Sequence, residues 1–568
     1  MSQFLNLSVP KEWKTMTASN LLSTAQPILQ TLQQGLDDAV HVWRVDGLLS
    51  WPTVYLITTA VLTYWTYLVA QRLFFHPLAG IPGPKLAALT YWYEIYYDVW
   101  KGGQYFRQVK QMHEKYGPIV RINPDEVHFN DPEFIEPLYP SAKRKTNKSV
   151  MTGRRTGTPN SLAGTADHDT HRLRRSTISG FFSTASIRRL EPIMKADMRK
   201  LLSRMHEAGE TGEVLKFHFV LKACACDIVT QYAFGTSFNF LGERDFAAPY
   251  IEATDVFHFF NHAMCHFPIV GYLLGASPDW LIKSVFPGLT EMWNKKTMWL
   301  DEVEKIRSSP NPERIKSTIF EGVLGSKLPD EEKTNARLAH EAQLVVFAGQ
   351  GTTAYTLSAA IYQLLAHPDE LAKVKKELAD ALGGGGGGGN VTDDDDGIPS
   401  YSQVENLPYF QAAIQETLRL HPGVVARLPR VSPTEPIVYE DKARGRSYVV
   451  PAGVTYSMTA QIAHTNKAVF ADADKFIPQR WIDNPRLDRA FIGFARGTRN
   501  CIGMNFAKQE LSIILATILL KYDLYRGQEG PTLELYNTTR ERDIDCVRDM
   551  IIPFPAAGSP GLQLRVRN

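Results

Sequence analysis

The longest uncharged apolar stretch of the chain runs from residue 47 to residue 71, "GLLSWPTVYLITTAVLTYWTYLVAQ". A helix of about 20 apolar residues is long enough to cross the hydrocarbon core of a bilayer. Trp51, Tyr55, Trp65 and Tyr67 are aromatic residues of the kind that anchor such a helix at the membrane interfaces. The stretch therefore predicts a single transmembrane helix over 47–71. A buried core helix is the alternative.

The residues on either side of this stretch predict its orientation. It begins only after 46 residues and is too long for the apolar region of a cleaved signal peptide. Arg72 and Lys85 follow it, against Arg44 before it, and this bias favours a cytosolic position for the large domain that follows. Residues 1–46 would then form a lumenal segment, in which the "NLS" at Asn6 is the one sequon open to glycosylation.

Proline and glycine dominate the next residues. Pro77, Pro82 and Pro84 alternate with Gly80 and Gly83, a composition that disfavours both helix and strand. We therefore expect a stiff hinge over 72–84 and a catalytic domain over 85–568.

Helical periodicity prevails in the remaining chain. We expect short strands early, at 118–131, and late, at 446–458, and so a mainly α fold with small β-sheets. The apolar stretch at 341–371 predicts a long buried helix that ends near His367, with Pro368 opening the next helix. Gly349 and Gly351 in its middle suggest close approach of a flat group or a local opening of the helix. The Gly/Asp-rich residues 383–397 predict a flexible surface loop.

Composition excludes several classes of protein. The net charge of +2 gives no global case for nucleic-acid binding, and we expect the basic run at 143–148 to be a solvated surface. Five cysteines in 568 residues do not make a disulfide framework, which fits a reducing compartment. We interpret four of them as small hydrophobic residues: Cys224, Cys226, Cys265 and Cys546.

Cys501 differs from the other cysteines because it lies in the basic, glycine-containing turn "FARGTRNCIG". The apolar periodicity from Leu511 onwards places it just before or at the start of a helix, where the helix dipole favours an anion. Arg496 and Arg499 add positive charge, so we expect a lowered thiol pKa. A nucleophile, a metal ligand and an inert buried cysteine are the alternatives. No signature of a partner base supports the nucleophile.

This turn resembles the haem-binding loop of the cytochrome P450 superfamily, F-x-x-G-x-R-x-C-x-G. Phe494, Gly497, Arg499, Cys501 and Gly503 occupy its fixed positions, and Ala495 is a mild departure. The resemblance extends from about residue 72 to the end of the chain and points to fungal microsomal members that oxidise terpenoids. It implies a cytochrome P450 fold behind the membrane helix, with haem b as cofactor and Cys501 as its axial iron ligand.

Further motifs occur in the order of that family. "ETLR" matches E-x-x-R at Glu416 and Arg419, and "FIPQRW" supplies the arginine, Arg480, to which that pair is expected to bind. "HRLRR" resembles W-x-x-x-R, with His171 in place of tryptophan. The resemblance implies that Phe494 and Gly503 bind the haem, and it suggests four candidates for contacts to the haem propionates: His171, Arg175, Arg430 and Arg499.

"AGQGTT" stands where the family has A-G-x-D/E-T-T, so Thr352 supplies the expected alcohol and Gly351 replaces the expected acid. Gln350, or water in an opened helix, could relay protons instead, with Thr352 positioning them. A carboxylate on the substrate could help. Alternatively, the enzyme could be an oxygen-independent isomerase or dehydratase. Retention of the alcohol favours the first explanation, with Thr352 and Gln350 as catalytic residues.

The family resemblance implies a monooxygenase of the endoplasmic reticulum membrane, single-pass, with its catalytic domain in the cytosol. It would take electrons from NADPH–cytochrome P450 reductase and oxidise a lipophilic secondary metabolite, for which a terpenoid is our prediction. A haem sensor or carrier is a further alternative. Arg427 is expected at a propionate, although a substrate carboxylate is possible. The expected substrate pocket comprises Phe347, Ala348, Val424, Val425, Leu428 and Ile551.

Overall fold

The computed structural model describes residues 51–141, 144–295, 297–310, 318–382 and 397–568, with a few helical residues between 26 and 38. Several predictions concern residues outside this description. They are those for Asn6, for nearly all of the segment 1–46, for residues 47–50, for Lys143 and for the Gly/Asp loop up to residue 396. The chain divides into two compact units, Met1–Ala79 and Gly80–Asn568.

The first unit contains a helix with the length and composition of a membrane span. α2 (Trp51–Ala70) continues into the π-helical turn η2 (Gln71–Phe75), and most of its side chains are exposed. Twenty residues of α-helix extend about 30 Å, close to the thickness of a bilayer's hydrocarbon core. Among the described residues, only one other helix is apolar enough to cross a membrane, and that helix is largely buried in the second unit.

The predicted hinge is only partly non-helical. Residues up to Phe75 still form η2, and helix resumes with α3 (Lys85–Leu89), so turns and bends cover residues 76–84 alone. The expectation that 72–84 excludes helix is wrong at its first four residues. The reason is that the first proline of the stretch, Pro77, comes only after Phe75.

The second unit is mainly helical with small sheets, as the pattern predicts. Its longer helices are α5 (Tyr105–Tyr116), α8 (His168–Ile178), α10 (Glu191–Thr211), α11 (Phe217–Phe234), α12 (Ala248–His258), α17 (Met298–Arg307), α20 (Asn335–Ala366), α21 (Pro368–Leu382), α23 (Pro408–Leu420) and α26 (Met504–Lys521). Shorter helices include α4 (Trp92–Ile95), α7 (Val150–Gly153), α13 (Asn261–His266), α14 (Pro268–Ala276), α16 (Thr290–Asn294) and α25 (Gln479–Asp483).

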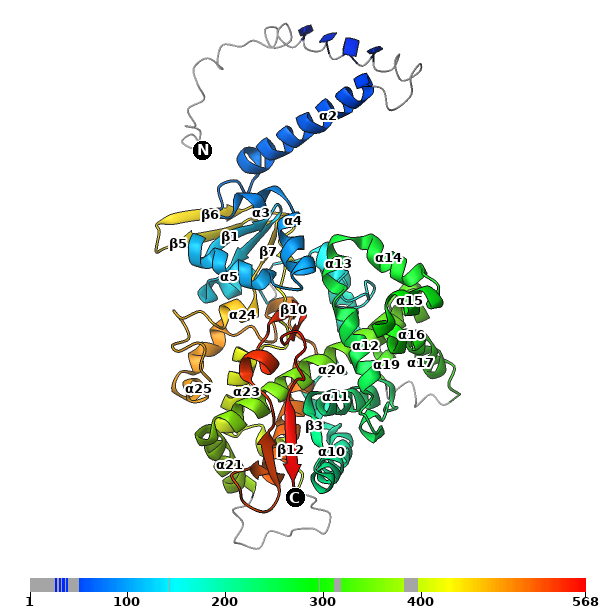
Figure 1. Ribbon diagram of the computed structural model, residues 1–568, viewed down its shortest axis with the longest axis vertical. Coiled ribbons are helices and arrows are strands. Elements are labelled where there is room, and N and C mark those ends of the chain that lie inside the picture. The colour runs from blue at the N-terminus through cyan, green and yellow to red at the C-terminus, as the bar shows by residue number, and fades with distance from the viewer. Residues whose placement is uncertain are drawn as a thin grey trace. The chain divides into compact units, whose positions relative to one another are not determined.

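Two four-stranded sheets and two hairpins complete this unit. The first sheet has the order β1 (Ile119–Asn123), β2 (Glu126–Phe129), β7 (Thr455–Ser457), β4 (Arg430–Val431), and it lies beside α3 and α5 (Figure 1). The second has the order β3 (Val214–Lys216), β12 (Gln563–Arg567), β9 (Thr532–Leu535), β8 (Asp523–Leu524). The hairpins are β5 (Ile437–Asp441) with β6 (Arg446–Val450) and β10 (Arg548–Met550) with β11 (Ile552–Phe554).

α20 lies at the centre of the core and contacts α11, α17, α23 and α26. Its two central glycines are explained by packing. A Cβ at Gly349 would lie 3.1 Å from Cγ2 of Val229 on α11, and one at Gly351 would lie 3.2 Å from Cδ1 of Ile552 on β11. Hydrogen-bonded helix continues through both positions, so the expected local opening of the helix is absent there.

Glu416 on α23 is fully buried and joins three segments of the chain. Its carboxylate accepts from Arg419 Nε and Nη2 at 2.8 Å each, and from Arg480 Nε at 3.1 Å. The Trp481 indole and the Ile477 amide donate to it as well. A buried carboxylate with this many donors is well compensated, and removing one charged partner of such a pair typically costs about 3–5 kcal/mol of stability.

Candidate active site

A cavity of about 320 Å³ lies between α20, the start of α26 and the turn that carries Cys501. Its lining is mostly apolar, which suits a lipophilic ligand. Eight of the candidate catalytic, haem-binding and substrate-pocket residues line it: Ala348, Thr352, Val424, Leu428, Phe494, Arg499, Cys501 and Gly503. The structure therefore brings the cysteine, the alcohol of α20 and part of the expected pocket to one space.

The Cys501 turn is shaped by its backbone. The amide of Cys501 donates to the carbonyl of Phe494 at 2.9 Å, which closes the turn, and α26 begins at Met504 directly after it, as predicted. Gly497 has φ +73°, and a Cβ there would lie 2.6 Å from the carbonyl oxygen of Tyr139, so only glycine fits. Ala495 also has a positive φ, +56°, a conformation that glycine adopts more readily than alanine.

A hydrogen-bonded path connects the turn to the buried ion pair of α23. The Ile492 amide donates to Nε2 of His464 at 2.9 Å, and Nδ1 of that ring lies 3.2 Å from the carbonyl of Arg419. Burial and the charge of Arg419 lower the pKa of His464 to about 3, so the ring is neutral. His464 also stacks on Phe491. It was missed in the sequence because no local pattern relates it to the turn.

The Cys501 side chain is exposed to the cavity, whereas the other four cysteines are buried. The surrounding protein desolvates the Cys501 thiol and so raises its pKa, although the Gly503 amide and Arg175 act in the opposite direction. The expectation of a lowered thiol pKa is therefore wrong for the protein alone. Arg496, one of its expected sources, is occupied by Asp488 at 3.0 Å. A bound metal would favour the thiolate.

A cluster of basic residues lies beside the cavity. Burial and then the charges of Arg499, Arg175, Lys148 and Arg430 lower the pKa of His171 to about 3. Burial and Arg430 lower the pKa of Arg499 to about 9, and burial with Arg430, Arg499 and Arg155 lowers that of Lys148 to about 7. These groups repel one another, so the cluster favours a bound anion. The four propionate candidates lie together, and Lys148 joins them.

Lys148 corrects the expectation that the whole run 143–148 is a solvated surface. Its side chain is half-buried and donates to the carbonyl of Ala163 at 2.7 Å. Lys145 in the same run is exposed and pairs with Asp169. A difference between neighbouring lysines of this kind follows from tertiary packing and has no signal in the sequence.

Arg499 and Arg175 connect the cluster to the cysteine turn. Arg499 donates to the carbonyls of residues 165–167, while its Nε is buried and has no hydrogen-bond partner in the described structure. Arg175 donates to the carbonyl and the side chain of Asn500, next to Cys501, at 2.7 and 2.8 Å. An unpartnered guanidinium nitrogen, a group of cations and a cavity-facing thiol fit a haem with two acidic propionates.

Thr352 and Gln350 lie on different faces of α20. Thr352 lines the cavity, and its hydroxyl donates to the carbonyl of Ala348 at 2.8 Å. Gln350 instead borders a separate small space of about 10 Å³ with Gly351, Asp255 and Lys222, and its Nε2 is buried without a partner. The structure therefore does not bring Gln350 to the cavity, because two residues along a helix turn a side chain by about 200°.

Three of the expected pocket residues do not line the cavity. Val425 is fully buried against Phe106 and Cys546. Ile551 has φ +79°, and its carbonyl accepts from the amide of Val425. Phe347 borders a second cavity on the neighbouring face of α20. Val425 and Phe347 are sequence neighbours of the lining residues Val424 and Ala348, and Ile551 lies in the turn between β10 and β11. The sequence pattern alone could not tell these residues from those that line the cavity.

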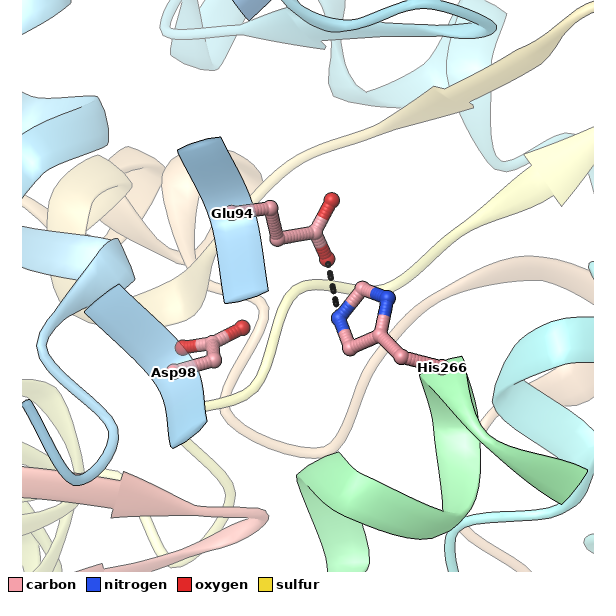
Figure 2. A group of neighbouring side chains, drawn as sticks. All are labelled: Glu94, Asp98 and His266. Atoms are coloured by element: carbon pink, nitrogen blue, oxygen red, sulfur yellow. Dashed lines mark ion pairs between the residues drawn. The ribbon is translucent and has the colours of Figure 1, made fainter. Parts of the chain in front are cut away.

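Arg427 binds neither a propionate nor a free substrate site. Its guanidinium donates to Glu94 and, from Nε, to Glu126 at 2.9 Å. Glu94, Asp98 and His266 point into the same buried space, with Glu94 3.5 Å from the His266 ring nitrogen (Figure 2). The expectation for Arg427 is therefore wrong. The arginine joins α4 and β2 by ion pairs, and His266 of α13 pairs with the same Glu94.

Glu510 on α26 is a further buried acid, not singled out from the sequence. Its Oε2 accepts from the hydroxyl of Thr353, which lines the cavity next to Thr352, at 3.2 Å. Its Oε1 is buried without a partner, and no basic side chain in the described chain forms an ion pair with it. Burial raises the pKa of Glu510 well above its ordinary value and thereby favours the protonated carboxyl.

Known proteins resemble this chain over nearly its whole length. The family model described as cytochrome P450 matches residues 82–539. The chain is 36% identical to cytochrome P450 monooxygenase tpcC of Cochliobolus heterostrophus, over 89% of this chain and 95% of that protein. It is 34% identical to a tryptophan 6-hydroxylase of Fusarium equiseti, over 88% and 94%, and 33% identical to a fusicoccadiene C-8 hydroxylase of Phomopsis amygdali, over 94% and 99%.

The unpartnered Nε of Arg499 predicts a role in retaining the haem. Arg499→Leu should speed haem loss to a haem-scavenging protein roughly tenfold or more, because a charge-assisted hydrogen bond contributes about 1.5–3 kcal/mol. Arg499→Lys should be intermediate, and Arg172→Leu, on an exposed position of α8, should behave as the unaltered protein. An unchanged loss rate in Arg499→Leu would contradict the assignment.

Proposed function

This chain belongs to the cytochrome P450 family, and from that membership we propose that it inserts oxygen from O₂ into a lipophilic secondary metabolite, with a terpenoid as the preferred substrate class. The family and its monooxygenase relatives make it an oxidoreductase. The observation that carries the proposal is Cys501, facing an apolar cavity beside a cluster of uncompensated cations.

The residues that would hold the haem have distinct tasks. Cys501 would bind the iron, while Arg499, Arg175, Arg430, His171 and Lys148 would meet the propionates. When bound, the haem would supply O₂ binding at its iron and cleavage of the O–O bond after two one-electron reductions. The protein's tasks are to orient the substrate, to exclude water and to deliver protons.

The apolar wall formed by Ala348, Val424 and Leu428 supports a lipophilic substrate. The relatives' names include both a fusicoccadiene hydroxylase and a tryptophan 6-hydroxylase. A terpenoid is the class that our family resemblance favours.

Proton delivery in this enzyme requires a substitute for the acid missing at Gly351. Glu510 is suited to that task because burial favours its protonated form and because it is hydrogen-bonded to Thr353 on the cavity wall. The Thr353 hydroxyl would first rotate so that its proton points into the cavity. The carboxyl would then give its proton to Oγ1 of Thr353, and Thr353 would pass its own hydroxyl proton into the cavity. Thr352 would accept a hydrogen bond there and orient the receiving group. Glu510 would regain a proton from solvent.

The anchor and the electron supply complete the proposal. α2 would span the endoplasmic reticulum membrane once and hold the catalytic domain on the cytosolic side, where NADPH–cytochrome P450 reductase would donate electrons. The length and apolar composition of Trp51–Phe75 support this assignment.

A comparison of metabolites tests the function directly. Lipophilic extracts of the native host with and without this gene would be compared by mass spectrometry. We expect the disrupted strain to accumulate a precursor that lacks one or more oxygen atoms. Accumulation of an isomer of the product, or of a compound that differs by water, would contradict oxygen insertion and favour an isomerase or dehydratase.

The proposed proton route predicts the effect of Glu510→Gln. This variant keeps the size of the side chain and an acceptor for Thr353 but removes the acidic proton. The share of NADPH electrons recovered in product should fall severalfold, with a matching rise in hydrogen peroxide, and Thr352→Ala should do the same. The product yield per NADPH, the peroxide yield and the kinetic solvent isotope effect measure this coupling.

Asp255→Asn is the matched control, because Asp255 pairs with Lys222 at 2.6 Å beside Gly351, on the other side of α20 from Glu510. It should leave coupling unchanged. The opposite result would overturn the route through Thr353: an unchanged product yield per NADPH in Glu510→Gln, together with peroxide release in Asp255→Asn. Protons would then enter the site from the Gly351 side of α20.

A further inference from the structure

A second cavity of about 520 Å³ lies next to the Cys501 cavity, between α12, α14, α16 and α20. The two spaces share α20 as a wall. Gln343 and Phe347 line the second cavity, while their sequence neighbours Leu344 and Ala348 line the first. Consecutive residues of a helix point about 100° apart, so the two cavities occupy neighbouring faces of α20.

Aromatic side chains from several helices contribute to the walls of this second cavity. Tyr250 and Phe257 come from α12, Trp293 from α16, Trp299 from α17 and Phe347 from α20. Flat apolar walls of this kind hold rigid or ring-containing ligands by burial and stacking. The volume is that of an ordinary small-molecule site.

The charged groups of the cavity are all basic. Its lining includes Lys295 and Arg154 and no Asp or Glu among the described residues. Nζ of Lys295 lies 4.7 Å from the ring centre of Tyr250 and 5.4 Å from that of Phe240, and it pairs with no carboxylate of the described residues. Ring faces compensate an ammonium group only in part, by about 0.5–2 kcal/mol. Lys295 therefore retains a positive charge that a bound anion would pair.

His340 adds a neutral polar group to the same wall. Its Nδ1 is buried and has no hydrogen-bond partner in the described structure. Burial and the nearby Arg337 lower the pKa of His340, so its ring is uncharged. A neutral imidazole can still donate one hydrogen bond to a ligand. A ligand oxygen in this cavity would thus find a lysine and an imidazole on an otherwise apolar wall.

We propose that this second cavity binds the carboxylate end of a lipophilic monocarboxylic acid, which is thereby held for oxidation in the adjoining Cys501 cavity. The proposal rests on the function proposed above and narrows its substrate class, from any lipophilic metabolite to an acid. Lys295 is the principal recognition group, with Arg154 at the exposed edge. A neutral hydrocarbon of the same shape would leave the charge of Lys295 unpaired.

The test compares an acid with its own methyl ester. The probes are 4-(pyren-1-yl)butyric acid and its methyl ester, added to the full-length, haem-loaded protein in lipid nanodiscs, with protein-free nanodiscs subtracted. Pyrene fluorescence anisotropy reports binding without any turnover. We expect the acid to bind roughly tenfold more tightly than the ester, since a charge-assisted hydrogen bond contributes about 1.5–3 kcal/mol.

Variants assign that preference to the cavity. Lys295→Met should remove most of the tenfold difference and leave ester binding within about twofold of the original, while Lys295→Arg should retain the difference. Lys305→Met, on an exposed lysine of the neighbouring helix α17, should change neither probe. Three outcomes would each overturn the proposal. The unaltered protein could bind acid and ester equally, it could bind neither probe, or Lys295→Met could weaken the binding of both equally.

The outcome is separable from that of the proposed function. Failure to form an oxygenated product with reductase and NADPH would contradict the monooxygenase function while leaving the acid-over-ester preference intact. Loss of the preference with normal oxygenation of neutral metabolites would overturn only the acid-binding cavity.

Discussion

The buried carboxylate of Glu416 is the interaction on which the geometry of the site depends. It is bound at once by Arg419 from its own helix and by Arg480 and Trp481 from a segment more than sixty residues later. Arg419 in turn bonds to His464, whose ring receives the Ile492 amide at the entrance to the cysteine turn. Because Glu416, Arg419 and His464 are fully buried, their hydrogen bonds favour one position of the Cys501 turn relative to α23.

Charge is distributed unevenly around the cavity, and this asymmetry gives the site its chemistry. One edge collects cations whose pKa values are lowered by burial and by one another, so it favours an acidic cofactor. Next to Thr352, Thr353 is hydrogen-bonded to Glu510, whose protonated form is favoured by burial. A helix that lacks its acid at Gly351 thus still has a buried proton source within reach, contributed by the helix that follows the cysteine. This arrangement favours an enzyme that activates oxygen over an oxygen-independent isomerase or dehydratase.

Local features of the chain could be predicted from the sequence, because they follow from periodicity and backbone chemistry. The end of α20 before Pro368, the strands near 119–129 and 446–457, and the position of Cys501 before α26 are examples. Contacts between distant segments could not. Arg427 pairs with Glu94 and Glu126, and Lys148 lies in the cation cluster, through folding alone. The thiol pKa was predicted with the wrong sign because burial outweighs the nearby positive charge.

The carbon monoxide difference spectrum of the reduced, haem-loaded protein tests the central claim, that Cys501 binds iron as a thiolate, most directly. The full-length chain and its Cys501→Ser variant would be compared at equal haem content. The account predicts the strongly red-shifted absorption band of a thiolate-ligated haem in the unaltered protein and its loss in the variant. The same band in Cys501→Ser, or the spectrum of a nitrogen-ligated haem in the unaltered protein, would contradict it.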